Sequence, residues 1–199
     1  VIAGAVGIRE FASIRALEKN LKETYEKVQQ ELVDIKELKQ DLFHKIDMVN
    51  KKLKEENQLL LQTTYLMNEG INSLRAGNSD QAIEKFEGVL KNSPDDYSTL
   101  CYLARAYGLT ERFMSAKMYA KKAISIDSDK YFAYYILGEI YRIQKEYSKS
   151  ISNLYRAVEL APLTKNFNGL GYAFMKNGDY KYAIEAFKES LLIEERYSS

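Results

Sequence analysis

Residues 131–163 read YFAYYILGEIYRIQKEYSKSISNLYRAVELAPL. Apolar residues recur every three or four positions in both halves of this stretch, a period that is typical of amphipathic helices. Gly138 lies in the first half, Ser150 lies in the second half, and Pro162 lies near the end. Because proline lacks an amide hydrogen and its ring clashes with the preceding helical turn, we expect Pro162 to end a helix. The stretch therefore predicts two helices joined by a turn.

The same arrangement occurs four times in the second part of the chain. A small residue recurs at intervals of 34, 34 and 33 residues, at Gly70, Ala104, Gly138 and Gly171. A large apolar residue precedes it by four positions, and a small residue follows it by twelve. The position sixteen residues after it is occupied by Phe86, Ala120, Leu154 and Phe187. Both prolines of the chain fall twenty-four residues after the small residue, where the other two units have Ser128 and Glu195. We expect the proline, or the residue that replaces it, to end the second helix of each unit. Such a period predicts a repeat architecture.

This pattern resembles the tetratricopeptide repeat, a unit of two antiparallel helices. The resemblance covers residues 63–199, with units at 63–96, 97–130, 131–163 and 164–197. It implies an α-solenoid with a concave groove, in which the small residues let the two helices of a unit approach closely. Unit two departs from the pattern at Ala120, where a large aromatic residue is usual, and we expect the neighbouring Tyr119 to compensate.

Residues 10–62 follow a different pattern and contain neither glycine nor proline. Apolar residues repeat every seven positions at two core positions over about seven heptads, which is a strong coiled-coil signature. We expect a single helix whose apolar seam packs against a second copy of the chain. Leucine at one core position and β-branched residues at the other favour a trimer or tetramer over a dimer. The predicted seam comprises Ile14, Leu21, Val28, Leu32, Ile35, Leu42, Ile46, Val49 and Leu53.

Two charged residues interrupt the seam, and no helix breaker separates it from the first repeat. Glu18 and Lys39 occupy core positions, where they either fix the register of the coil or extend to its edge. We call the predicted coiled-coil helix, residues 10–62, the stalk. Because no glycine or proline follows until Gly70, the stalk is expected to continue directly into the first repeat helix. The predicted fold class is therefore all-α, with a long N-terminal coiled-coil helix followed by an α-solenoid of four helix-turn-helix repeats.

The composition gives no support for catalysis or for nucleic-acid binding. The 199 residues include 29 basic and 28 acidic side chains, and a net charge of +1 gives no basis for a dedicated nucleic-acid binder. His44, the only histidine, falls at an outer heptad position, where we expect it to be solvated. Cys101 has no second thiol to pair with and is interpreted as a structural thiol or a groove wall. We therefore predict no enzyme activity, no cofactor and no metal site.

The resemblance also implies where a ligand binds. In the family, the first helix of each unit lines the concave face, which suits an extended or helical peptide. The alternative is that the apolar members of this face pack between units or against the stalk. Chaperone-binding members hold a C-terminal carboxylate with a lysine and an asparagine in the first unit, where this chain has methionine and isoleucine, so EEVD-type chaperone tails are not expected ligands. Carried over to this chain, the groove candidates are Met67, Ile71, Cys101, Arg105, Phe132, Tyr135, Glu139, Arg142, Lys165, Asn168 and Tyr172.

The segment 1–9 consists of eight apolar or small residues followed directly by Arg9. We interpret it as the end of a membrane anchor that begins upstream of Val1, or as the flank of a signal peptide. The alternatives are a disordered end and an apolar start to the seam. The order of stalk and repeats is similar to that of bacterial cell-envelope proteins that join a trimeric coiled coil to tetratricopeptide repeats beside the Tol–Pal system. Both points favour a membrane-associated or envelope location over free cytoplasm.

The sequence therefore predicts a non-enzymatic adaptor. An oligomeric stalk would present several grooves to a protein or peptide partner, and multivalency would raise the avidity. The alternative hypothesis is a self-assembling spacer at a membrane, in which the repeat faces pack on one another.

Overall fold

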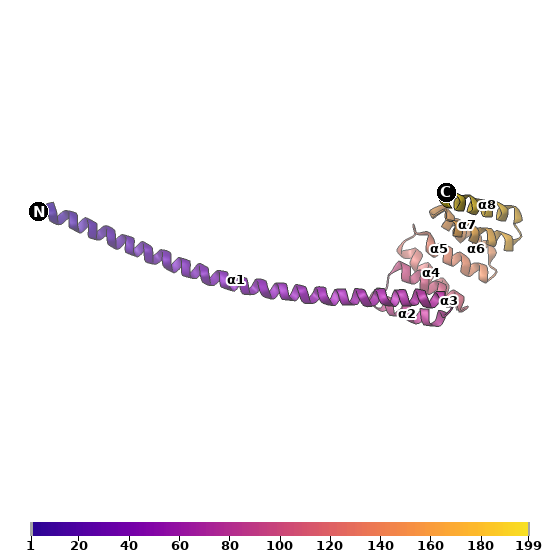
Figure 1. Ribbon diagram of the computed structural model, residues 1–199, viewed down its shortest axis with the longest axis horizontal. Helices are drawn as coiled ribbons and strands as arrows, with labels where there is room; N and C mark the ends of the chain where they lie inside the picture. The colour runs from indigo at the N-terminus through magenta and orange to yellow at the C-terminus, as the bar shows by residue number, and fades with distance from the viewer. Residues whose placement is uncertain (1, 199) are drawn as a thin grey trace. The chain divides into compact units, whose positions relative to one another are not determined.

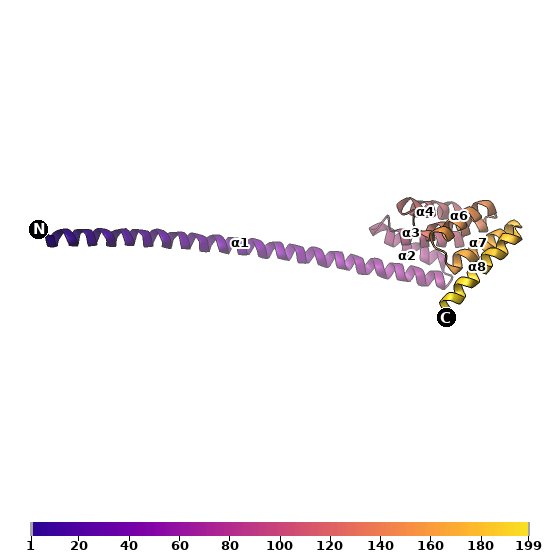
Figure 2. The ribbon, with the colours of Figure 1, turned by 90° about the horizontal axis from the view of Figure 1, so that it is seen from above.

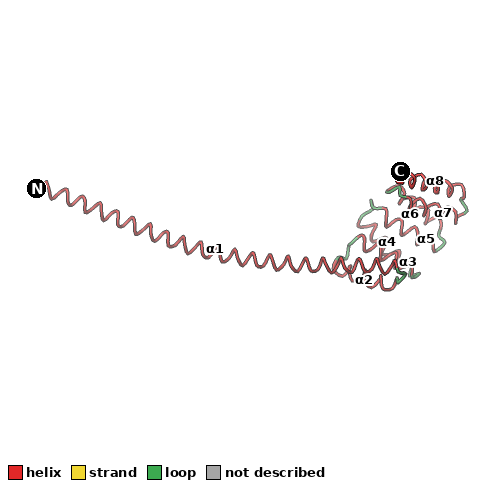
Figure 3. The backbone as a smooth tube through the Cα atoms, in the orientation of Figure 1, coloured by secondary structure: helices red, strands yellow, loops and turns green. Residues whose placement is uncertain are grey.

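The computed structural model describes the backbone of residues 2–198 and the side chains of Phe11 and residues 13–196. The described residues form helices joined by short loops and include no strand, which confirms the all-α fold class (Figure 3). The helices are labelled in Figure 1, and their bounds are α1 Ile2–Arg75, α2 Ser79–Asn92, α3 Tyr97–Leu109, α4 Phe113–Ile126, α5 Tyr131–Ile143, α6 Tyr147–Leu160, α7 Thr164–Asn177 and α8 Tyr180–Ser198.

The chain divides into two units, Val1–Gln58 and Leu59–Ser199. α1 is a single unbroken helix, so the long N-terminal helix predicted from the heptads is confirmed. Every predicted seam residue is exposed in the single chain, including Leu21 at 72% and Ile35 at 60%. The seam therefore has the apolar surface that a coiled coil requires, and the coiled coil itself stays a prediction.

The segment 1–9, predicted to end an anchor or flank a signal peptide, lies outside the residues whose side chains are described. Within the described part of the chain, none of the helices combines the length and apolarity that a membrane span needs.

In the second unit, successive helices pack in chain order as four pairs. The end of α1 packs on α2, and the pairs α3 with α4, α5 with α6 and α7 with α8 follow. Figure 2 shows α7 and α8 lying side by side. α3 also contacts α5, and α5 contacts α7, so the first helices of successive pairs are neighbours. This arrangement is the α-solenoid that the repeat predicts.

Glycine allows the two helices of a pair to cross closely. A Cβ atom added to Gly70 would lie 2.5 Å from Phe86 Cε1, and one added to Gly171 would lie 2.7 Å from Phe187 Cε1. At Gly138 the added atom would lie 2.6 Å from Leu154 Cγ. Real Cβ atoms essentially never come this close to another atom. The close approach predicted from the sequence is therefore present in three of the four pairs.

The second pair reaches the same packing with different side chains. Ala104 carries a Cβ atom, and its partner position holds Ala120 rather than a large residue; both are fully buried in one cluster. Tyr119 packs against that cluster and stacks on Tyr107, with the ring centroids 5.5 Å apart. The expected compensation by Tyr119 is thus observed, because its ring supplies volume that the small Ala120 lacks.

The turn inside each pair uses a left-handed residue. Gly77 has φ of 81°, and Gly178, which ends α7, has φ of 91°. The equivalent residues in the middle pairs are Glu111 and Lys145, with φ of 58° and 63°. A side chain with a Cβ atom is strained in this conformation. The middle turns therefore carry strain that the glycine turns avoid.

The second helix of the pair ends as predicted in three of the four units. Pro94 lies in the loop between α2 and α3, Pro162 lies between α6 and α7, and Ser128 follows the end of α4. The expectation that Glu195 ends a helix is wrong, because α8 continues to Ser198. Glutamate retains an amide donor and fits a helix well, so it does not interrupt the hydrogen-bond ladder as proline does.

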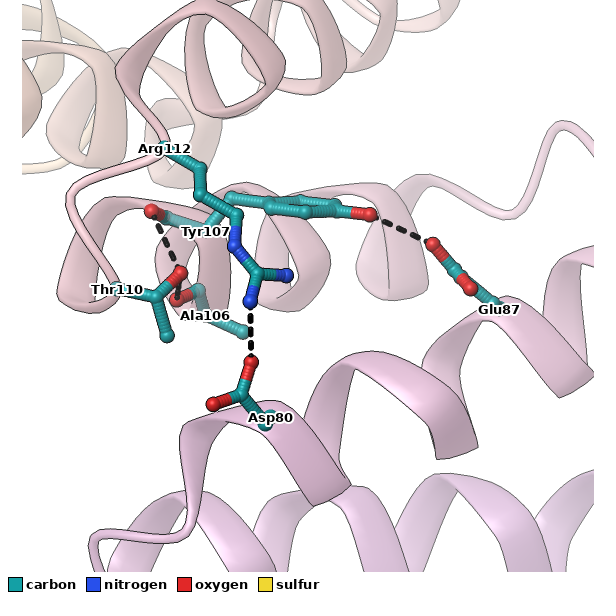
Figure 4. A network of polar contacts seen from close by, with 6 residues as sticks. All are labelled: Asp80, Glu87, Ala106, Tyr107, Thr110 and Arg112. Atoms are coloured by element: carbon teal, nitrogen blue, oxygen red, sulfur yellow. Dashed lines mark hydrogen bonds and ion pairs between the residues drawn. The ribbon is translucent and has the colours of Figure 1, made fainter.

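Polar contacts connect the first two pairs (Figure 4). Arg112 Nη2 lies 2.6 Å from Asp80 Oδ1, and the Tyr107 hydroxyl donates a 2.6 Å hydrogen bond to Glu87 Oε1. The Arg112 guanidinium also lies over the Tyr107 ring, 5.8 Å from its centroid. Burial and the hydrogen bond to Glu87 raise the pKa of Tyr107 to about 12. The phenol is therefore a neutral donor, and it ties α3 to α2.

The Gly138 crossing gives a first prediction. Gly138→Ala forces the new Cβ atom into Leu154, and we expect it to lower the free energy of unfolding by about 1–3 kcal/mol, as overpacking does. Leu154→Ala alone should cost ~2–5 kcal/mol through a cavity. The double variant reproduces the Ala104 and Ala120 combination and should cost less than the sum of the two. Urea denaturation followed by circular dichroism measures all three.

Gly88→Ala is the matched control for that cycle. An added Cβ atom there meets only the flexible end of Leu66, with Cδ1 at 3.2 Å. We expect this control to be neutral or stabilising because alanine favours a helix. Strict additivity of the Gly138 and Leu154 substitutions would contradict the steric explanation.

The strained turns give a second prediction. Lys145→Gly relieves a left-handed strain of ~1–2 kcal/mol, and the greater freedom of glycine in the unfolded chain offsets ~0.5–1 kcal/mol of it. We expect a net gain in stability of about 0.5–1 kcal/mol by thermal denaturation. Gly178→Ala is the matched reverse change and should lose stability through backbone strain alone, since no atom lies within 4 Å of the added Cβ. A loss of stability in Lys145→Gly would refute the assignment of strain.

Candidate protein-binding groove

A hollow of about 350 Å³ opens on the side formed by the first helices of three pairs. α5 contributes most of its lining residues, α3 contributes Arg105, Gly108 and Leu109, and α7 contributes Lys165. Six of the predicted groove residues come together here: Arg105, Phe132, Tyr135, Glu139, Arg142 and Lys165. Apolar side chains, including Ile136, Ile140 and Ile143, complete the lining. The hollow therefore combines an apolar surface with charged groups, as ligand pockets commonly do.

Aromatic rings of α5 hold the ammonium group of Lys165. Its Nζ atom lies 4.8 Å from the ring centroid of Tyr131, 5.0 Å from that of Phe132 and 5.6 Å from that of Tyr135. A cation over a ring face is attracted by the negative face of the π-system. These contacts fix one positive charge at the hollow and connect α7 to α5.

An ion pair fixes a second cation beside the first. Arg142 donates from Nε to Glu139 Oε1 at 3.1 Å and from Nη2 to Oε2 at 2.8 Å. The hydrogen bond to Glu139 raises the pKa of Arg142 further. Burial, and next the charge of Glu139, raise the pKa of Tyr135, so its hydroxyl group is neutral. A neutral phenol at the hollow can donate a hydrogen bond to an anionic ligand.

Two smaller hollows adjoin this one and share residues with it. One of about 140 Å³ is lined by Ile71, Leu74, Arg75, Tyr102 and Arg105. Another of about 300 Å³ includes Tyr102, Lys130, Phe132 and Lys165. The Tyr102 ring lines both of these hollows and packs edge-on against Phe132, with the ring centroids 5.5 Å apart. We name the three hollows together the cationic groove.

Ile71 thus lies within the cationic groove, whereas four other predicted residues lie outside it. Cys101 is fully buried beside Leu100, so the structural interpretation of this thiol is supported and its assignment to the groove surface is wrong. Met67 lines a separate hollow and accepts a hydrogen bond at its sulfur from Thr99. The remaining two are on α7, where exposed Tyr172 packs edge-on against a ring of α8 and Asn168 is half-buried nearby.

Sequence reasoning missed several lining residues, and helical geometry explains how some could be found. Leu109 and Ile143 lie one turn after the predicted Arg105 and Glu139, and positions i and i+4 share a helix face. Tyr102 lies four residues after the exposed Ser98 and therefore shares its helix face, whereas the neighbouring Cys101 is buried. Arg75 and Lys130 lie at helix ends that the repeat pattern does not mark.

The structure shows little that resembles catalytic chemistry. His44 is exposed on α1. Among the residues that the structure describes, no three histidine, cysteine, aspartate or glutamate side chains are grouped so as to hold a metal ion. Burial raises the pKa of Cys101 to about 12, and this keeps the thiol protonated and unreactive.

Known proteins match the second unit. The tetratricopeptide repeat model matches residues 133–162 and 165–197. A general transcriptional corepressor, trfA of Dictyostelium discoideum, is 24% identical over 124 residues, which is 61% of this chain and 9% of that protein. The chain therefore spans only about a tenth of the length of this curated relative.

Solved structures agree in fold. The MamA protein is 30% identical with a TM-score of 0.55, over 67% of this chain and 73% of that one. TTC0263 of Thermus thermophilus, a thermophilic TPR protein, is 21% identical with a TM-score of 0.62, over 67% and 75% of the two chains. The chain belongs to the tetratricopeptide repeat family, whose members generally serve as non-catalytic scaffolds for protein–protein interaction.

The burial of Cys101 gives a third prediction. We expect iodoacetamide to label Cys101 negligibly in the folded protein and completely after denaturation, because the side chain is inaccessible and protonated. Ser98→Cys in a Cys101→Ala background is the matched control, since Ser98 is exposed one turn away. Mass spectrometry measures both. Equal labelling rates at positions 98 and 101 in the folded chain would contradict the burial.

Proposed function

We propose that this chain is a non-enzymatic, oligomeric adaptor that binds a protein or peptide partner in the cationic groove and presents that groove on a coiled-coil stalk. The groove is the observation that carries the proposal. Six residues predicted to contact a ligand surround one hollow, and tyrosine and arginine, both present there, are among the residue types that dominate binding energy at protein interfaces.

The exposed seam of α1 supports the oligomeric part of the proposal. Nine apolar seam residues are between 45% and 72% exposed in the single chain. Burying such a stripe against other helices is favourable at roughly 25 cal/mol per Å² of apolar surface. The assembly would then carry several grooves, and simultaneous binding would raise the avidity for a clustered partner. A trimer or tetramer remains our expectation over a dimer, as does a membrane-associated location.

The seam generates a fourth prediction. Val28→Glu with Ile35→Glu places charges in the seam, and we expect the mass of the intact chain by light scattering to fall to that of a monomer. Gln40→Glu with Gln58→Glu adds the same charge at outer heptad positions and should leave the oligomer intact. A monomeric mass for the unmodified chain would refute the coiled coil.

The groove is tested separately with a displayed library of random peptides. We expect the intact chain to enrich peptides, and Tyr135→Glu or Arg105→Glu to abolish enrichment without changing the oligomeric mass. Tyr155→Glu is the matched control, because Tyr155 is 53% exposed on a second helix, α6. Enrichment that survives both groove substitutions would refute the adaptor function.

A second function, self-assembly through the repeats, has one supporting observation on α8. Ile151 and Val158 of α6 are half-buried against the core beside α7. Their equivalents on α8, thirty-three residues later, are Ile184 and Leu191, which are 55% and 59% exposed. α8 thus presents the surface that α6 uses to bind the following helix. If this is the function, Ile184→Glu should lower the assembled mass while the seam remains intact.

A further inference from the structure

We propose that the ligand of the cationic groove is an acidic peptide segment, whose carboxylate side chains bind Arg105 and Lys165 while a neighbouring apolar side chain enters the main hollow. This inference rests on the proposed function and specifies the chemistry of the partner. It concerns carboxylates within the bound segment and does not require a free C-terminus.

Charge segregation is the first argument. The chain has 29 basic and 28 acidic side chains, so its composition is almost neutral. The groove is not neutral: within the part of the chain that the structure describes, its three hollows are lined by five cationic residues and by Glu139 as the one acidic residue. The cationic residues are Arg75, Arg105, Lys130, Arg142 and Lys165. A concave surface of one sign attracts and orients a partner of the opposite sign.

The pairing of these cations is the second argument. Arg142 is neutralised by Glu139, and Lys130 lies 3.0 Å from Asp127. Arg75, Arg105 and Lys165 form no ion pair with any residue that the structure describes. The contacts of Lys165 are with aromatic rings, which hold the ammonium in place and leave its charge uncompensated. Charge-assisted hydrogen bonds to carboxylates are therefore available at Arg105 and Lys165.

The shape and apolar lining of the groove favour a peptide over a nucleic acid. Arg105 and Lys165 border the same 350 Å³ hollow, whose apolar lining includes Ile136 and Ile140. An apolar side chain next to a carboxylate fits that combination, whereas the largest aliphatic group on a nucleobase is the single methyl group of thymine. Stacking of bases needs free ring faces. Here Lys165 already covers one face of the Phe132 and Tyr135 rings.

Two pools of short fluorescein-labelled peptides test the proposal on the intact chain by fluorescence anisotropy. One pool mixes apolar residues with aspartate and glutamate, the other mixes them with asparagine and glutamine, and both are amidated at the C-terminus. We expect the acidic pool to bind about tenfold or more tightly than the amide pool. Its binding should also weaken on moving from physiological salt to ~1 M salt, where the screening length falls from ~8 to ~3 Å.

Single substitutions test whether Arg105 and Lys165 are the side chains that bind the carboxylates. Arg105→Gln and Lys165→Gln should each weaken binding of the acidic pool about tenfold and leave the amide pool unchanged. Lys91→Gln and Lys121→Gln are the matched controls, because these lysines are exposed on the second helices α2 and α4. Arg105→Gln is the primary variant, since Arg105 is exposed and its loss breaks no ion pair within the described part of the chain.

Each remaining outcome overturns the inference, and one of them also bears on the proposed function. If the two pools bind equally and Tyr135→Glu abolishes binding of both pools, the acidic specificity is refuted and the peptide-binding adaptor function is supported. Absence of binding by either pool, with no peptide enriched from the random library, would refute both the acidic specificity and the adaptor function. Competition by single-stranded oligothymidylate at the affinity of the acidic pool would show a nucleic-acid site instead.

Discussion

The close crossing of two helices within each repeat is the constraint on which the second unit depends. In three of the pairs the helices approach closely at a glycine, and Gly70, Gly138 and Gly171 provide the space that a ring or a leucine then fills. Interiors are packed as densely as organic crystals, so the two positions must change together. The Ala104 and Ala120 pair shows that they do, because the larger residue in the first helix is matched by a smaller one in the second. The constraint is therefore on their joint volume rather than on glycine itself.

Fixing the crossing within each pair also fixes the surface between pairs. Once the second helices pack behind the first, α3, α5 and α7 become neighbours and their outward faces form one concave surface. Tyr97 helps to align this stack: its hydroxyl donates to the Lys130 carbonyl at 3.1 Å and accepts from the Ala133 amide at 3.0 Å. Burial raises the pKa of that phenol, so it remains a donor throughout the physiological range. Lys165 adds a further link, and in doing so it places a charge where a ligand would bind.

The repeat was predictable from sequence because its determinants are residue types at fixed spacing, and the helix–helix crossings and the proline loops follow from them. The groove was predictable only in part. Arg105, Phe132 and Lys165 lie on the expected face. On α3, Cys101 is buried at the edge of that face, and the next residue, Tyr102, lines the groove in its place. Spacing along a helix gives a face to within about one residue, and a single position is enough to exchange a buried for an exposed side chain. The left-handed Glu111 and Lys145 were also missed, since neither residue type indicates that conformation.

Net charge proved to be a poor guide to the chemistry of this surface. A composition that is balanced to within one charge contains a groove in which cations outnumber acids by five to one. The seam of α1 and the outer face of α8 differ from the groove because they are mainly apolar and exposed. An apolar stripe on a helix is buried by packing against the apolar face of another helix, and this does not require a particular charge on the partner. A concave cationic surface with apolar walls instead selects for a complementary sign and shape. The two kinds of surface are therefore suited to different partners, so assembly and ligand recognition can be separated by mutation within the same chain.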